Sequence, residues 1–168
     1  IEKGFADLES LSGIPGTVGG APIQNIGAYG HEVSETIARV KAYDRKIGEV
    51  VTFTNEQCHF SYRNSTFKAD AGRYVILNVT FQLRKGEMSL PITYLELANY
   101  LSVSLGDRAP VKEVRKAVLE LRGRKGMLIN STDVNSNSAG SFFVNPILSK
   151  DLADKLPADA PRWPQTDG

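Results

Sequence analysis

The chain has 168 residues, of which 41% are hydrophobic and 23% are charged, and its formal net charge is +1. A charge so close to zero provides no general field to attract nucleic acid or an anionic membrane. No apolar run approaches the roughly 20 residues of a membrane-spanning helix. Cys58 is the only cysteine, which excludes an internal disulfide and fits a reducing cytoplasm. We expect Cys58 to be a partly buried structural residue rather than a catalytic thiol.

Glycine is dense in the first of the predicted segments, between Ser12 and Gly30. Such density predicts a backbone that turns tightly or approaches another group closely. Free N–H groups in this stretch could receive a pyrophosphate. The spacing, however, matches neither Gly-x-Gly-x-x-Gly nor a Walker loop. On spacing alone, a tight structural turn is at least as good an interpretation.

Strand-like segments follow. Residues 38–43 alternate between polar and apolar side chains, and Gly48 then leads into residues 49–53. These two segments predict a hairpin closed by residues 44–48. The segment 74–83 is rich in β-branched and aromatic residues, which makes it the strongest predicted strand of the chain.

Helices are predicted in the second half of the chain. Residues 93–100 form a short candidate, and residues 111–124 form a longer one. The longer helix carries an apolar stripe made of Val111, Val114, Val118 and Leu121. Residues 131–140 are polar and predict a loop, and residues 149–156 predict another short helix. The composition changes near Gly106, from strand-rich to helix and loop, which predicts a boundary between two lobes there.

Four polar side chains are candidates for binding or catalysis. Arg63 lies among aromatic and hydroxyl residues and suits a carboxylate or phosphate partner, although an isolated arginine is more often a surface charge. Arg122 and Lys125 share one face at a helix end, where they either complement the helix dipole or grip a diphosphate. Ser141 lacks a histidine partner, which argues against a nucleophilic hydrolase, but a held hydroxyl can donate a proton.

The two histidines, His31 and His59, are assigned no role. Neither belongs to a recognisable catalytic motif, and no Asp/Glu cluster accompanies them at ligand spacing. We therefore predict no metal site.

Motifs in this order resemble one family. Residues 12–30 read Ser-Gly-Ile-Pro-Gly-Thr-Val-Gly-Gly-Ala-Pro-Ile-Gln-Asn-Ile-Gly-Ala-Tyr-Gly, residues 62–68 read Tyr-Arg-Asn-Ser-Thr-Phe-Lys, residues 122–125 read Arg-Gly-Arg-Lys, and residues 140–146 read Gly-Ser-Phe-Phe-Val-Asn-Pro. They are similar to the flavin loop, catalytic-arginine motif, substrate-binding helix end and proton-donor motif of the MurB family, the UDP-N-acetylenolpyruvoylglucosamine reductases. Residues 93–97 resemble the tyrosine-bearing insertion of the type I enzymes, which folds over bound substrate.

The resemblance implies an α+β fold. Residues 1–106 would form the C-terminal part of a mixed-sheet FAD-binding domain, and residues 107–168 a small α/β substrate-binding lobe. The whole protein would use FAD and NADPH to reduce UDP-N-acetylglucosamine enolpyruvate to UDP-N-acetylmuramate in peptidoglycan precursor synthesis. It would be a cytoplasmic monomer whose partners are NADPH and the nucleotide sugar, not nucleic acid or a membrane.

The resemblance also implies the roles of individual residues. Ser141 would be the proton donor, and Arg63 would polarise the substrate carboxylate and stabilise the charge that develops beside it. The implied substrate-binding residues are Tyr29, Tyr94, Arg122, Lys125 and Asn145. The implied cofactor-binding residues are Gly13, Ile14, Pro15, Gly16, Thr17, Gly19, Gln24, Asn25, Gly27 and Ala28.

The chain departs from the family pattern at both ends. The family's first FAD-binding lobe is missing before Ile1, and its third catalytic residue, a glutamate, would lie beyond the segment 164–168. We therefore expect this chain to be an inactive fragment that retains FAD poorly. Two alternatives stay open: another flavin oxidoreductase of similar architecture, and a non-catalytic nucleotide-sugar binding module.

Overall fold

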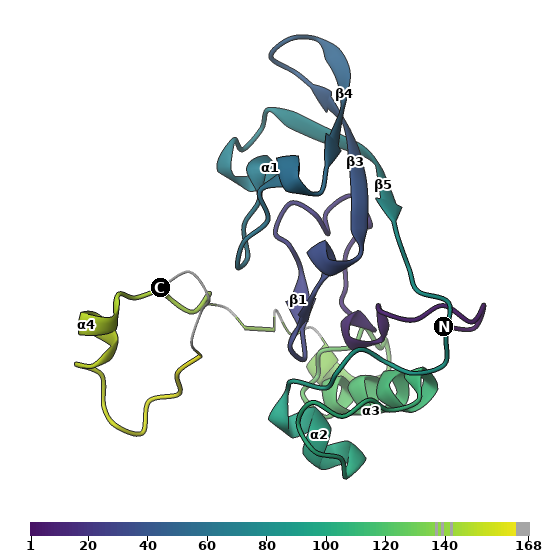
Figure 1. Cartoon of the computed structure of the whole chain (residues 1–168), viewed down its shortest axis with the longest axis vertical. Coiled ribbons are helices and arrows are strands. Elements are labelled where there is room, and N and C mark those ends of the chain that lie inside the picture. The colour runs from purple at the N-terminus through teal and green to yellow at the C-terminus, as the bar shows by residue number, and fades with distance from the viewer. Residues whose placement is uncertain (137, 139, 142, 164–168) are drawn as a thin grey trace.

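The computed structural model describes residues 1–136, 138, 140–141 and 143–163. Its elements gather into a sheet end and a helix end, with the N-terminal 35 residues running between them (Figure 1). The described elements include both helices and antiparallel sheets, which confirms the α+β class. Every pairing between named strands in this part of the chain is antiparallel.

The sheet end is a three-stranded sheet in the order β4-β3-β5. Strands β3 (Ile37–Asp44) and β4 (Glu49–Thr54) form the predicted hairpin, and β5 (Tyr74–Phe81) lies on the other side of β3. Gly48 closes the hairpin with φ 73°, and its N–H donates to the Asp44 carbonyl at 2.9 Å. The third strand ends two residues earlier than predicted, because Gln82 donates its N–H to Thr36 just outside β3.

A hydrophobic core lies against one face of this sheet. Val40 and Ala42 of β3 are fully buried there, beneath the short helices η3 (Glu56–Cys58) and α1 (Thr66–Ala69). Phe67 meets Phe53 edge-on, with ring centroids 5.2 Å apart. Cys58 is fully buried in this core, and burial raises the pKa of its thiol to about 11. The thiol is therefore neutral near pH 7 and unreactive, as a structural cysteine should be.

The helix end has a core of its own. Helix α2 (Leu95–Leu101) packs on α3 (Val111–Arg124), and both bury apolar side chains against Ile92. The predicted stripe of α3 is confirmed, since Val111, Val114, Val118 and Leu121 are all buried. The helix ends as Gly126 takes φ 64° and donates its N–H to the Gly123 carbonyl at 3.0 Å.

A small hairpin joins the two cores. Strands β1 (Gly27–Ala28) and β2 (His31–Glu32) pair antiparallel and are followed by the 3-10 turn η2 (Val33–Glu35). Tyr29 in the hairpin turn packs into the helix core, whereas Val33 packs into the sheet core. The hairpin and the earlier 3-10 turn η1 (Glu9–Leu11) therefore hold the two ends in a fixed relation.

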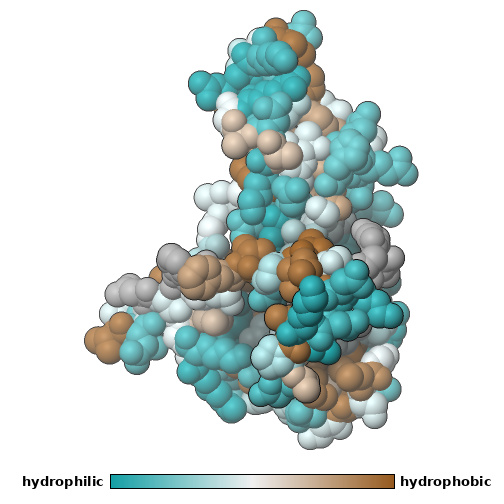
Figure 2. All heavy atoms as spheres, turned by 90° about the vertical axis from the view of Figure 1, so that its left-hand side faces the viewer, coloured by the Kyte–Doolittle hydropathy of each residue, from teal (hydrophilic) through white to brown (hydrophobic). Residues whose placement is uncertain are grey.

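The C-terminal residues contain the 3-10 turn η4 (Val134–Ser136) and helix α4 (Lys150–Ala153). Figure 1 shows α4 well away from the other elements. The predicted lobe boundary near Gly106 stays a prediction; α2 and α3, which flank it, share one core. None of the helices described here is long and apolar enough to cross a membrane. Figure 2 shows hydrophobic residues gathered near the middle of the face that carries the C-terminal segment with α4.

Candidate functional site

The predicted cofactor loop is open to solvent over residues 15–18. Gly16 takes φ 132°, and a Cβ added there would meet no atom within 4 Å. The backbone N–H groups of Gly16, Thr17, Val18 and Gly19 donate no hydrogen bond to any described residue. Free N–H groups on an open, glycine-containing loop suit phosphate oxygens. This donor set fits the diphosphate of FAD.

Gly13 at the start of the loop has a different reason to be glycine. Its φ is 76°, and a Cβ added there would overlap the side chain of Leu128 and come within 3.0 Å of Leu119. It would also lie 3.5 Å from Nε of Arg122. Glycine at this position therefore lets the loop approach the end of α3 closely.

Asn25 was predicted to line the cofactor, but its side chain is fully buried and already hydrogen-bonded. Its Nδ2 donates to Glu32 at 2.6 Å and to the Ser61 carbonyl at 3.1 Å, and its Oδ1 accepts from the N–H of Ser34 at 3.1 Å. The amide therefore holds Glu32 and the 61–64 turn in place. Neighbouring Gln24, in contrast, is exposed.

Arg63 lies at the tip of the 61–64 turn with φ 52°, a conformation uncommon outside glycine. Its guanidinium donates to the Gly27 carbonyl at 2.8 Å and to Glu32 at 3.2 Å, and lies 4.9 Å from the centroid of the Tyr62 ring. A Cβ at Gly27 would stand 2.7 Å from Nη1 of Arg63, so this approach requires glycine. Backbone strain of this kind collects at functional sites, which favours the predicted role of Arg63.

Glu32 is a neighbour of Arg63 that no sequence motif marks. Burial raises the pKa of this carboxyl group, while the hydrogen bond from Asn25 and the charge of Arg63 act to lower it. A carboxylate ligand arriving at Arg63 would compete with Glu32 for the guanidinium. Only the tertiary fold brings the two residues together, since they lie 31 positions apart.

Four of the five predicted substrate-binding residues meet at the helix end, from three separate segments. Tyr29 and Tyr94 contact edge to face, with ring centroids 5.4 Å apart. Burial raises the pKa of Tyr29, and the charges of Lys125 and Arg122 act on the same hydroxyl to lower it. We call Tyr29, Tyr94, Arg122 and Lys125 the tyrosine–basic cluster.

Arg122 and Lys125 differ in their burial and in their partners within this cluster. Arg122 is only 9% exposed; its Nη2 donates to the Met127 carbonyl at 3.1 Å, and its buried Nε has no partner among the described residues. Burial lowers the pKa of Arg122. Lys125 forms an ion pair with Glu96 at 2.6 Å, which raises the pKa of Lys125. The cluster therefore presents one cation, Lys125, that an anion could take from Glu96, while Nε of Arg122 is enclosed beneath Gly13.

The predicted proton donor lies in the segment after η4. Ser141 and Asn145 are both exposed. Residue 142 of this motif lies outside the described residues, as do residues 137 and 139 before it and the segment 164–168. The roles of Ser141 and Asn145 remain predictions.

Comparison with known proteins identifies close relatives. Residues 1–54 match a family described as "FAD binding domain". The chain is 49% identical, over its whole length, to a UDP-N-acetylenolpyruvoylglucosamine reductase of Streptomyces avermitilis, covering 49% of that protein. It is 51% identical, again over its whole length, to the reductase of the same name from Cutibacterium acnes, covering 44% of it. The chain thus spans about half the length of the curated relatives it matches.

A solved structure gives a weaker likeness. The crystal structure of UDP-N-acetylenolpyruvylglucosamine reductase from Thermus caldophilus superposes with a TM-score of 0.49 and 24% identity. The match covers 74% of this chain and 37% of that one. A likeness of this strength adds nothing to the sequence matches.

Proposed function

Because the chain belongs to the UDP-N-acetylenolpyruvoylglucosamine reductase family, we propose that the whole protein is an FAD- and NADPH-dependent enzyme. It reduces the enolpyruvyl ether of UDP-N-acetylglucosamine to the lactyl ether of UDP-N-acetylmuramate, a step of peptidoglycan precursor synthesis. The reaction takes place in the cytoplasm, and the nucleotide sugar and NADPH are its partners.

The observation that carries the proposal is the tyrosine–basic cluster. Two aromatic rings and two cations converge from residues distant in sequence, at Tyr29, Tyr94, Arg122 and Lys125. Aromatic faces and fixed cations together suit a nucleotide diphosphate, because the cations bind phosphate and the rings pack against a base or sugar.

Arg63 would hold the other end of the substrate. Its guanidinium contacts the carbonyl of Gly27 at the start of β1, while Tyr29 lies in the turn directly after that strand. We assign Arg63 to the carboxylate of the enolpyruvyl group, with Glu32 as the counter-ion that the substrate displaces. A fixed cation beside a carboxylate stabilises the negative charge that develops there during reduction.

Bound FAD would supply the transfer of hydride from NADPH to the enolpyruvyl carbon. The N–H groups of Gly16 to Gly19 would hold its diphosphate. Ser141 would then donate the proton that completes the reduction. Its exposed position leaves the hydroxyl free to meet substrate.

The test uses the full-length protein and the variant Ser141→Ala. We expect turnover of the enolpyruvyl nucleotide sugar to fall by about a hundredfold or more, the usual contribution of a general acid. Reduction of the bound flavin by NADPH should be unchanged, because it precedes the proton transfer. Stopped-flow absorbance measures the two half-reactions separately. Unchanged turnover would contradict the role of Ser141, whereas a wild-type protein that binds the nucleotide sugar without turning it over would favour the non-catalytic binding module.

The 168-residue chain alone is expected to hold FAD weakly and to be inactive, since it spans about half the length of its relatives. Flavin absorbance after gel filtration tests this directly. Near-stoichiometric flavin in the purified chain would contradict it.

A further inference from the structure

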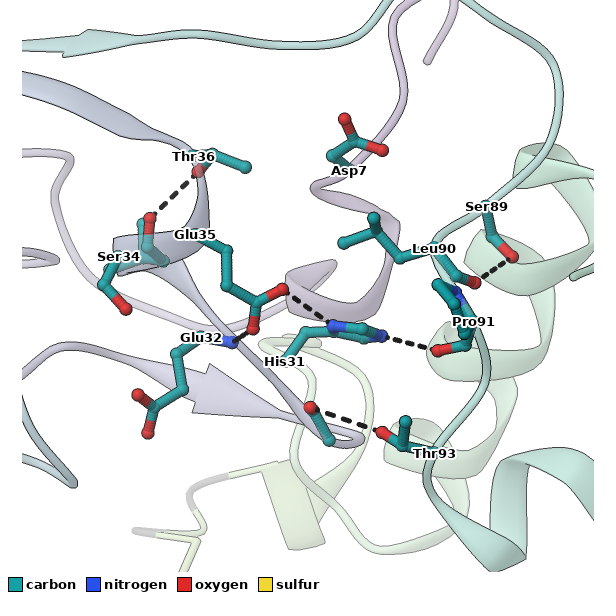
Figure 3. Close-up of polar contacts among 12 residues, drawn as sticks. Asp7, His31, Glu32, Ser34, Glu35, Thr36, Ser89, Leu90, Pro91 and Thr93 are labelled. Carbon is teal, nitrogen blue, oxygen red and sulfur yellow. Dashed lines mark hydrogen bonds and ion pairs between the residues drawn. The ribbon is translucent and has the colours of Figure 1, made fainter. Parts of the chain in front are cut away.

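The turn after β1 lies beside the segment that leads into α2. Tyr29 contacts Tyr94, as described above. The next residue, Gly30, accepts a hydrogen bond at its carbonyl from Thr93 Oγ1, at 3.4 Å. His31 then lies opposite Pro91, with Nε2 at 3.0 Å from the Pro91 carbonyl oxygen. Three consecutive residues of the hairpin therefore contact three positions of the facing segment. Figure 3 shows the contact of His31 with Pro91 and that of Thr93 with the turn.

The ring of His31 lies between two oxygens that can only accept hydrogen bonds. Its Nδ1 is 2.9 Å from a carboxylate oxygen of Glu35, on the opposite side from the Pro91 carbonyl. A neutral imidazole carries one N–H and can satisfy only one of these oxygens, whereas an imidazolium donates to both. The side chain of His31 is 13% exposed, so little water is available to replace a lost bond. The geometry therefore favours the protonated ring, the only form that donates to both oxygens.

The position of Glu35 is fixed independently of His31. Its other carboxylate oxygen accepts the N–H of Glu32 at 2.7 Å in a capping box that starts η2. Glu35 therefore stays in place as an ionised acceptor, and its pKa is lowered by His31 and by this backbone bond, although burial opposes the shift.

The other charged groups around His31 also favour the cation. Glu9 of η1 adds a second negative charge that acts on the ring. Asp7 and Arg84 line the cavity beside Glu35, where they pair with each other at 2.9 Å and largely cancel. No described cation is paired with Glu35 in place of His31.

We propose that His31, in its protonated form, is a positioning residue for the tyrosine–basic cluster. Its imidazolium ties the segment 91–94 to the turn 29–31 and so keeps Tyr94 against Tyr29. This proposal rests on the proposed function for the identity of the ligand, a nucleotide diphosphate sugar, but the tether itself is a property of the fold.

The tether weakens as pH rises. Carboxylate partners raise the pKa of His31 above its ordinary value of about 6.5. The tether is therefore complete below that ordinary value and is lost as pH rises through the higher pKa of the folded state. The neutral ring keeps its stronger, charge-assisted bond to Glu35. The bond to Pro91 is then the one that breaks, and Tyr94 moves away from Tyr29.

The first experiment needs no ligand. Nitrogen-15 NMR of the full-length protein, with the His31 signals assigned through their contacts with neighbouring residues, reports the charge of the His31 ring from about pH 6 to about pH 9. We expect both ring nitrogens to be protonated at neutral pH, and the Tyr29–Tyr94 ring contact to weaken as the proton leaves. A ring that is neutral at pH 7, or a tyrosine contact that does not follow the titration, would overturn the proposal.

The second experiment measures affinity for UDP-N-acetylglucosamine by calorimetry on the full-length protein. This probe is suitable because its diphosphate is a diester and does not titrate in the same range. We expect binding to weaken about three- to tenfold from pH 6 to pH 9, and His31→Gln to be equally weak at both values. The exposed-site variant His59→Asn is the matched control and should keep the wild-type pH profile.

The outcomes separate the two proposals. If the wild-type protein binds no UDP-N-acetylglucosamine at any pH, the proposed function fails, and the NMR titration still decides whether His31 forms the tether. If the probe binds with no pH dependence, the positioning role of His31 is wrong. If His31→Gln does not fold, the wild-type titrations carry the test alone.

Discussion

Gly13 is the residue at which the glycine-rich loop comes closest to helix α3. Replacement by alanine meets two penalties, since φ is 76° and the new Cβ would overlap Leu128 and crowd Leu119. The left-handed conformation costs roughly 1 kcal/mol for a non-glycine residue, and overpacking typically adds about 1–3 kcal/mol. We expect Gly13→Ala to lower the free energy of unfolding by about 2–4 kcal/mol, measured by urea denaturation.

Gly72→Ala is the matched control for this prediction. Gly72 has a similar φ of 83°, but a Cβ there would meet nothing within 4 Å. Gly72→Ala should therefore lower the free energy of unfolding only by the cost of the left-handed conformation, about 1 kcal/mol. Equal losses in the two variants would mean that the contact with α3 adds nothing at Gly13.

Residues differ in how far the sequence alone could place them. Arg122 and Lys125 could be predicted as a pair, because spacing on a helix fixes which side chains share a face. Glu32 and Glu96 could not, because their partners Arg63 and Lys125 lie 31 and 29 positions away in the chain. For His31, a signal was present: Glu35 follows at four residues. The spacing of His31 and Glu35 indicates an ion pair, but it points to a tether only once the Pro91 carbonyl is known to face the other side of the ring.

Helix α2 begins directly after Tyr94, the residue that contacts Tyr29. Only one face of α2 is buried. Leu97 is 1% exposed in the helix core, whereas Leu95 on the same helix is 61% exposed. We expect Leu97→Ala to lower the free energy of unfolding by about 2–5 kcal/mol, the usual result for a buried leucine. Leu95→Ala should change it by less than about 0.5 kcal/mol.

The same pair of variants tests the link from element to site. Because α2 begins directly after Tyr94, loosening α2 should also weaken the edge-to-face contact with Tyr29. Ring proton contacts in NMR would report this. An unchanged tyrosine contact in a destabilised Leu97→Ala protein would show that α2 does not position Tyr94.

Elements with a strong periodic pattern were predictable. Helix α3 has the predicted bounds, since its apolar stripe repeats over about three turns and the helix lies between Pro110 and Gly126. The β3–β4 hairpin follows from alternation and a glycine turn. Strands β1 and β2 were not predictable in the same way, because each is two residues long and they lie within and directly after the glycine-rich stretch. Their pairing depends on tertiary contacts around Arg63 and Tyr29.

At the scale of the whole molecule, the two hydrophobic cores are built from different residues. The buried residues of the helix core are Tyr29 and residues between 92 and 121, while those of the sheet core lie between 21 and 67. The tyrosine–basic cluster borders the first core, whereas Arg63 stands over the hairpin that joins the two. A ligand held by both groups would therefore bridge two units whose stabilities need not be equal.

Hydrogen exchange can show whether these units open separately. Val118 of α3 and Val40 of β3 are both fully buried, one in each core, so Val118→Ala and Val40→Ala are reciprocal probes. Each substitution should destabilise its own core by about 2 kcal/mol. That is about a thirtyfold increase in the exchange rate of amides that open with that core. We expect Val118→Ala to accelerate α3 and leave β3 unchanged, and Val40→Ala to do the reverse. Equal acceleration of both elements by either substitution would instead make the chain one cooperative unit, in which the binding of a nucleotide sugar at the helix end would stabilise the sheet end equally.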